Sequence, residues 1–128
     1  MRVEHVAFLV DDPNAVSKWY CENLGMKQVR QGPGPNFMTF LADDGDNVMF
    51  EIYANPEVQT PDYAAQDPLI LHLAFYSDDV DGDRARLIEA GATGVGDVFH
   101  REDGDVLAML RDPWGLAVQV LSRKERML

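Results

Sequence analysis

The distribution of apolar residues along the chain predicts eight short strands. Each strand is a run rich in β-branched and other large apolar residues, bounded by glycine, proline, asparagine or aspartate. Asp44-Gly45 is a strong hairpin signal, and Asp103-Gly104 supplies another turn. The predicted strands cover residues 2–10, 26–31, 36–43, 46–53, 69–77, 93–100, 105–111 and 115–122.

Two stretches show helical spacing instead, and they follow the first and the fifth strands. Asp12 supplies an N-cap for the first helix, with Pro13 at the first helical position. Gly25 is the expected stop, because a helix commonly ends on a glycine with positive φ. The second helix is predicted near 79–90, with Gly91 as its stop. Both helices are therefore short and each is followed by three strands.

One octapeptide occurs twice and relates the two halves of the chain. Residues 5–12 read H-V-A-F-L-V-D-D and residues 72–79 read H-L-A-F-Y-S-D-D, an offset of 72 − 5 = 67 residues. The turns at Asp44 and Asp112 are offset by 112 − 44 = 68 residues, so the repeat extends over whole βαβββ units. The sequence predicts an α+β protein built from two tandem βαβββ modules.

The module boundaries follow from the turns and the prolines. The chain of 128 residues has the length of a single domain, 1–128. Module one is predicted at 1–53 and module two at 69–122, with a tail at 123–128. Residues 54–68 hold three prolines without periodicity and are predicted to be the linker.

Strand alternation sorts the residues of four strands onto two faces. On one face of each strand a single metal-capable side chain stands among apolar neighbours: His5, Glu51, His72 or Gln119. Glu51 is costly to bury unless it is paired or bound to a metal. These four residues form two pairs that are equivalent under the repeat, so they are candidate metal ligands. The opposite faces are apolar and are expected to pack under the helices: Val6, Phe8, Val10, Val48, Phe50, Ile52, Leu71, Leu73, Phe75, Leu116, Val118 and Val120.

Charge and composition exclude several classes of partner. The chain has 11 basic and 22 acidic residues, a net charge of −11, which argues against nucleic acid and anionic membranes as partners. No apolar run reaches the roughly 18 residues of a membrane span. Met1-Arg2 leads directly into a strand without a signal peptide. Cys21 is the single cysteine, which fits a reducing compartment, so a cytoplasmic location is expected.

The sequence resembles the vicinal oxygen chelate superfamily over nearly its whole length. This superfamily includes glyoxalase I, fosfomycin-resistance proteins, extradiol dioxygenases and bleomycin-resistance proteins. The motifs that carry the resemblance are H-V-A-F-L-V-D-D, W-Y-C-E-N-L-G-M-K, F-E-I-Y-A-N, H-L-A-F and D-P-W-G-L-A-V-Q-V. The resemblance implies an open, cup-shaped, eight-stranded mixed sheet with a helix packed outside each half. It also implies one divalent metal ion on His5, Glu51, His72 and Gln119, and a homodimer. Whether the modules pair within or between chains stays open.

The chain departs from the superfamily pattern at three positions. Gln119 stands where many members have a glutamate, and an amide ligates through oxygen but takes no proton near neutral pH. Leu9 and Pro68 stand where enzymes of glutathione adducts carry arginines, although Asn55 matches a glutathione-contacting asparagine. Methylglyoxal detoxification is therefore not the expected reaction.

The leading functional hypothesis is a metal-dependent, glyoxalase-like lyase or isomerase. It would act on a small molecule with vicinal oxygens through an enediolate or alkoxide intermediate, with Glu51 as the catalytic base. Nitrogen and oxygen donors suit Ni, Co, Zn, Mn or Fe(II). One alternative is a metal-free, bleomycin-resistance-like binding protein, and another is an Fe(II) extradiol-type dioxygenase that uses two histidines and one carboxylate. Residues expected to line the substrate pocket are Leu9, Met49, Tyr53, Asn55, Tyr76 and Met109. Arg101 and Arg111 are expected to form surface salt bridges or to meet an anionic substrate.

Overall fold

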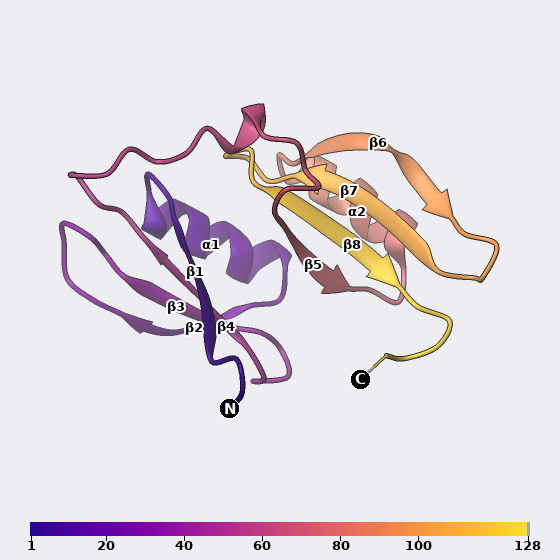
Figure 1. Cartoon of the computed structure of the whole chain (residues 1–128), viewed down its shortest axis with the longest axis horizontal. Coiled ribbons are helices and arrows are strands. Elements are labelled where there is room, and N and C mark those ends of the chain that lie inside the picture. Colours follow the sequence, from indigo (N-terminus) through magenta and orange to yellow (C-terminus); the bar gives the residue numbers. More distant parts are fainter. Residues whose placement is uncertain (128) are drawn as a thin grey trace. The chain divides into compact units, whose positions relative to one another are not determined.

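The computed structural model describes residues 1–127 and divides into two compact units. Module one is Met1–Pro61 and module two is Asp62–Leu128. Each module contains one α-helix and one four-stranded sheet (Figure 1). The predicted α+β architecture of two tandem βαβββ modules is therefore confirmed, with the eight strands shared equally between two mixed sheets.

The two modules have the same order of elements and the same sheet topology. Module one contains β1 (His5–Leu9), α1 (Pro13–Asn23), β2 (Lys27–Gln31), β3 (Thr39–Ala42) and β4 (Met49–Tyr53). Module two contains a 3-10 helix (Tyr63–Ala65), β5 (His72–Tyr76), α2 (Val80–Glu89), β6 (Thr93–His100), β7 (Val106–Arg111) and β8 (Ala117–Ser122). The strand orders are β1-β4-β3-β2 and β5-β8-β7-β6. In each sheet the first strand pairs in parallel with the last, and the remaining pairs are antiparallel.

Both helices begin and end at the residues that the sequence predicts. The Asp12 carboxylate accepts a hydrogen bond from the Ala15 amide at 3.0 Å, and Asp79 accepts one from Gly82 at 3.0 Å. These contacts satisfy amides that the first helical turn leaves without a partner. Gly25 follows α1 with a φ of +69°, the left-handed conformation that favours glycine. Among residues 1–127, no helix has the length and apolar character needed to cross a membrane.

The core of each module lies between its helix and one face of its sheet. In module one, the fully buried side chains include Val16 and Tyr20 from α1 and Leu41 and Ile52 from the sheet. Eight of the residues predicted to face the helices have less than a tenth of their surface exposed: Phe8, Val10, Phe50, Ile52, Leu73, Leu116, Val118 and Val120. These residues form the expected layer between sheet and helix.

Val6 and Leu71 differ from this expectation, since 43% and 42% of their surfaces are exposed. Both residues lie at the start of an edge strand or just before it. Helix α1 packs mainly against β2, β3 and β4, and α2 packs mainly against β6, β7 and β8. The edge strands β1 and β5 therefore contact the helix of their module less than the other strands do, and Val6 and Leu71 stay partly exposed.

The predicted linker, residues 54–68, is divided between the two modules. Its second part belongs to module two, where Tyr63 of the 3-10 helix is 8% exposed. The predicted tail is also attached to module two. The Arg123 guanidinium donates to Asp105 at 2.7 Å, and the Lys124 amide donates to the same carboxylate at 3.1 Å. The last residue of that tail, 128, lies outside the described residues.

Candidate functional site

In module one, the structure brings His5 and Glu51 together on one face of the sheet. Strand register pairs His5 with Met49 and Ala7 with Glu51, so the two side chains are diagonal neighbours on adjacent parallel strands. His5 Nε2 lies 3.2 Å from Glu51 Oε2. The Glu51 side chain is 14% exposed and the His5 side chain is 38% exposed. The sequence prediction that these residues share one face, opposite the helix, holds for this pair.

Glu4 is a member of this site that the sequence analysis missed. Its carboxylate bonds His5 Nδ1, the ring nitrogen that faces away from Glu51. The hydrogen bond to Glu4 raises the pKa of His5, and the negative charges of Glu4 and Glu51 add to it against the opposing effect of desolvation. When one ring nitrogen of a histidine binds a metal ion, a carboxylate on the other nitrogen fixes the ring orientation. It also makes the metal-binding nitrogen more basic and so a stronger ligand. In the sequence, Glu4 is marked only by its position directly before the candidate ligand His5.

Phe40 forms a wall of the same site. Register pairs Phe40 of β3 with Glu51, and its ring meets the His5 ring edge-on with centroids 5.9 Å apart. Edge-on contacts of this kind are a preferred arrangement of aromatic rings, so Phe40 helps to fix the orientation of the His5 ring. Phe40 has no distinguishing signal in the sequence, because an aromatic residue on a strand is usually a core residue.

In module two, His72 and Gln119 occupy the positions equivalent to His5 and Glu51. Register pairs His72 with Ala117 and Ala74 with Gln119, which repeats the diagonal relation of module one. His72 Nδ1 lies 3.0 Å from the carbonyl oxygen of Pro68. A carbonyl oxygen only accepts, so this contact requires the proton on Nδ1 and leaves the lone pair of Nε2 available. In the neutral ring, this contact favours the tautomer that leaves Nε2 able to ligate a metal ion.

The donors fit a divalent metal ion in their chemistry and, for one pair, in their spacing. Two donors bound to one ion at about 2.1 Å and at a right angle lie about 3.0 Å apart, close to the His5–Glu51 separation. Gln119 offers an amide oxygen and His72 offers Nε2. Among residues 1–127, no three His, Cys, Asp or Glu side chains form a group arranged to hold a metal ion. Each module by itself supplies two of the four predicted ligands, and the assembly of all four stays a prediction.

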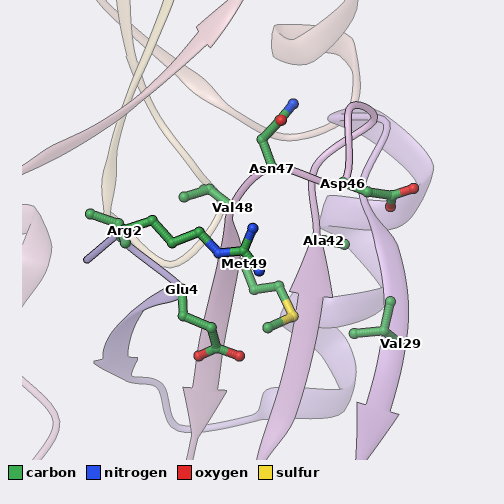
Figure 2. Close-up of a pocket in the computed structure, with 9 residues that line it drawn as sticks. Arg2, Glu4, Val29, Ala42, Asp46, Asn47, Val48 and Met49 are labelled. Atoms are coloured by element: carbon green, nitrogen blue, oxygen red, sulfur yellow. The ribbon is translucent and has the colours of Figure 1, made fainter.

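A pocket of about 520 Å³ lies at the His5 end of module one (Figure 2). Met49, a predicted pocket residue, lines it. The other side chains come from the first residues of the chain, from the β3–β4 turn and from neighbouring strands: Arg2, Val3, Glu4, Val29, Ala42, Asp46, Asn47 and Val48. The wall is therefore mixed, with apolar strand residues next to charged and amide groups.

The remaining predicted pocket residues lie at different places on the two modules. Leu9 and Tyr53 pair with each other further along the face that carries Glu51. Met109 pairs with Gln119 and so lies beside it on β7. Tyr76 lines a separate hollow of about 500 Å³ with Arg123 and Arg126, and Asn55 lines one of about 390 Å³ near Pro35 and Thr60. Module one therefore does not place Asn55 in the pocket that holds Met49.

The two selected arginines have different partners. Arg101 forms the expected surface ion pair, with Asp103 at 3.0 Å. Arg111 instead donates to three backbone carbonyl oxygens, those of Tyr63, Gly115 and Gln66, at 2.8, 2.9 and 2.6 Å. Arg111 therefore does not form the expected surface salt bridge among the described residues, and its guanidinium holds carbonyl groups around the β7–β8 turn and before β5.

The chain is a duplicated βαβββ protein. Each module carries a histidine on its first strand and a side chain with an oxygen ligand on its last strand, and these features define its class. The family model "Glyoxalase/Bleomycin resistance protein/Dioxygenase superfamily" matches residues 2–120. The chain belongs to this superfamily. A comparison with curated proteins gave no match.

Solved structures of the superfamily have the same fold. A glyoxalase family protein from Bacillus cereus has a TM-score of 0.78 at 19% identity, covering 95% of this chain and 93% of its own. A glyoxalase I mutant from Zea mays has a TM-score of 0.77 at 25% identity, covering 97% of this chain and 46% of its own. TnmS3, an antibiotic binding protein from a Streptomyces species, has a TM-score of 0.71 at 24% identity, covering 97% of both chains.

Proposed function

We propose that this protein is a metal-dependent lyase or isomerase that acts on a small molecule with two adjacent oxygen atoms. The observation that carries the proposal is the arrangement Glu4–His5–Glu51, with 3.2 Å between His5 Nε2 and Glu51 Oε2. This arrangement resembles the carboxylate–histidine–metal units of enzymes. The likeness to the maize glyoxalase I mutant supports the same reaction class.

His5, Glu51, His72 and Gln119 would hold the ion, two from each module. A divalent ion bound there would act as a Lewis acid on the two substrate oxygens. His5 is oriented for this by Glu4, and His72 by the Pro68 carbonyl. Phe40 meets the His5 ring edge-on, and Met49 pairs with His5 across β1 and β4, so two apolar side chains flank the histidine.

Glu51 is the group that moves the proton. Its carboxylate lies on the face of the candidate site and is mostly shielded from solvent, with 14% of the side chain exposed. Gln119, its counterpart, has an amide that neither takes nor gives a proton near neutral pH. Proton removal and return therefore fall to one base on one side of the substrate, which suits transfer between adjacent carbons. Epimerisation by two opposed bases does not suit this pair.

Metal titration tests the proposal directly. Isothermal titration with Ni²⁺ or Zn²⁺ should give one ion per chain in the wild type. Glu51→Gln should weaken binding by at least tenfold, because it removes a charged ligand. Glu57→Gln, an exposed carboxylate of the same module, is the matched control and should bind like the wild type. The absence of a stoichiometric site in the wild type would remove the proposal.

Proton exchange tests the chemistry with a simple probe. Dihydroxyacetone carries adjacent oxygens and an exchangeable C–H bond, so its deuterium uptake from D₂O can be followed by NMR. The metal-loaded wild type should accelerate this uptake, and Glu51→Gln should lower the acceleration by about 10²-fold or more. A loaded protein that gives no acceleration, but consumes oxygen with a catechol, would indicate the dioxygenase instead.

A second candidate function is the binding of a small cationic molecule without metal or chemistry. The net charge of −11 favours cationic ligands, and TnmS3 is named as an antibiotic binding protein. This candidate predicts no metal stoichiometry and tight binding of a glycopeptide such as bleomycin. The two sets of measurements therefore separate the two functions.

A further inference from the structure

The segment Asp62–Ile70, called the strap here, leads into β5 and is fastened to the rest of module two at several points. Arg111 Nη1 donates to the carbonyl oxygens of Tyr63 at 2.8 Å and Gly115 at 2.9 Å, and its Nη2 donates to Gln66 at 2.6 Å. One guanidinium thus joins the strap to the turn between β7 and β8. A planar fork of fixed donors suits this task, whereas an ammonium group does not span the same acceptors.

The end of the strap is a turn that fixes the carbonyl group of Pro68. The Asp67 carboxylate accepts from the Leu69 amide at 2.9 Å, and the Asp67 carbonyl accepts from the Ile70 amide at 3.0 Å. The Pro68 carbonyl accepts from His72 Nδ1 at 3.0 Å. Only Asp67 separates Pro68 from Gln66, whose carbonyl oxygen accepts from Arg111. The position of Pro68 therefore depends on the anchor at Arg111.

Arg111 and His72 also lie in the same row of the sheet. Register pairs Arg111 with Ala117, and Ala117 with His72, across β7, β8 and β5. The strap leaves the Arg111 end of this row and returns to the His72 end. It therefore links the two ends of the row that contains Arg111 and His72.

We propose that Arg111 is a positioning residue for His72, acting through the strap and the Pro68 carbonyl. By anchoring the strap it keeps the proton of His72 on Nδ1 and directs the lone pair of Nε2 outward. The effect of Arg111 on metal binding rests on the proposed function, since His72 acts as a ligand only if a metal ion binds. The tautomer of His72 is a property of the metal-free protein and can be measured independently of activity.

The test compares wild type, Arg111→Gln and Arg111→Lys by long-range ¹H–¹⁵N NMR of the histidine side chains. In metal-free wild type, His72 should be predominantly protonated on Nδ1. Arg111→Gln should shift His72 toward a mixture of both tautomers, and Arg111→Lys should give an intermediate result. The dissociation constant for Zn²⁺, from isothermal titration, should rise about tenfold in Arg111→Gln. Arg101→Gln, an arginine of the same module paired with Asp103, should change neither quantity.

The outcomes separate the inference from the proposed function. If His72 keeps its wild-type tautomer in Arg111→Gln, the positioning role is wrong, whatever the metal affinity. If wild type binds no Zn²⁺ but the tautomer shifts, the positioning role stands and the proposed function falls. Circular dichroism checks that each variant is folded. Should Arg111→Gln fail to fold, Arg111→Lys carries the decision, because it keeps the charge while loosening the strap.

Discussion

At the scale of single residues, His5 is defined by the two carboxylates on either side of its ring. When the His5 ring is protonated, it donates to Glu4 from Nδ1 and faces Glu51 with Nε2. Both carboxylates favour the charged ring, and the raised pKa of His5 reflects this. This contribution to stability is present at pH values below the ordinary pKa and is lost as pH rises through the raised pKa.

The first prediction concerns Glu4. Glu4→Gln should lower the pKa of His5 toward its ordinary value of 6.5, because the strongest of the raising contacts loses its charge. The measurement is an NMR titration of the His5 ring in the metal-free protein. Glu57→Gln should leave that pKa unchanged. An unchanged pKa in Glu4→Gln would show that Glu51 alone governs the ring.

The second prediction concerns Gly115. This residue has a φ of +94°, and an added Cβ would lie 2.8 Å from the Cβ and the backbone nitrogen of Ala64 in the strap. Gly115→Ala should therefore lower the free energy of unfolding by about 2–4 kcal/mol, from backbone strain and from the clash together. Urea denaturation measures the change.

Gly96 provides the matched control for this prediction. It also has a positive φ, +70°, but an added Cβ would meet nothing within 4 Å. Gly96→Ala should lower the free energy of unfolding by only about 1 kcal/mol, the backbone part of the effect. Equal losses in the two variants would mean that the strap moves aside without cost.

At the scale of elements, the start of α2 is tied to the end of β5 by one carboxylate. Asp83 accepts from the Ser77 hydroxyl at 2.6 Å and from the Arg86 guanidinium at 2.9 Å. The hydrogen bond from Ser77, followed by the contacts with Arg86, lowers the pKa of Asp83 against the opposing effect of burial. A group with a lowered pKa stabilises the fold above its ordinary pKa, and the effect is lost as pH falls through the lowered value.

The third prediction follows from this sign. At pH 6, Asp83→Asn should lower the free energy of unfolding by about 1 kcal/mol. The expected loss is this small because solvent screens the partly exposed contact between Asp83 and Arg86. The difference from wild type should shrink as pH falls below 3.8, the ordinary value for this carboxyl. Urea denaturation at pH 6 and pH 3 measures both. Asp81 lies in the same helical turn, so Asp81→Asn is the control for the interaction of a carboxylate with the helix dipole. An equal loss of unfolding free energy in Asp81→Asn would assign the effect of Asp83→Asn to the dipole.

The repeated register is the element-scale feature that places the candidate ligands. In each module the first strand lies parallel to the last. Glu51 pairs with Ala7, two positions after His5, and Gln119 pairs with Ala74, two positions after His72. A shift of one residue in either pairing would turn the ligand to the helix face. The turns at Asp44-Gly45 and Asp112-Pro113-Trp114-Gly115 therefore contribute to the site by fixing register.

At the scale of the whole molecule, the duplication divides the candidate ligands equally. Module one supplies His5 and Glu51, and module two supplies His72 and Gln119. We propose that the protein acts as a homodimer, which is what its resemblance to the superfamily implies. Modules that pair between chains would make each metal site from two chains, whereas modules that pair within a chain would make it from one.

The fourth prediction distinguishes these arrangements by mixing chains. His5→Ala and His72→Ala should each abolish stoichiometric Zn²⁺ binding alone. If sites form between chains, refolding the two variants together should restore about one quarter of wild-type stoichiometry, since half of the randomly formed dimers are mixed and each has one intact site. If sites form within chains, the mixture should bind no better than either variant. Isothermal titration reports the stoichiometry.

Much of the fold could be predicted from the sequence, because its signals are local. Aspartates before each helix, glycines after it and alternating apolar residues fix the elements within a few positions. The face shared by His5 and Glu51 also follows from alternation. Val6 could not be placed correctly in this way, since alternation assigns a face but not the extent of the helix that covers it.

What the sequence by itself determined is the duplicated α+β architecture and the identity of the candidate ligands, because repeat spacing and strand parity are properties of the chain alone. Only the tertiary structure decided their surroundings: Glu4 on the His5 ring, Phe40 beside it, and Arg111 anchoring the strap that reaches His72. Arg111 and Gln66 are separated by many residues in the chain and meet only after β7, β8 and the strap have packed. Such contacts depend on side-chain geometry across elements, which no local pattern of residues encodes.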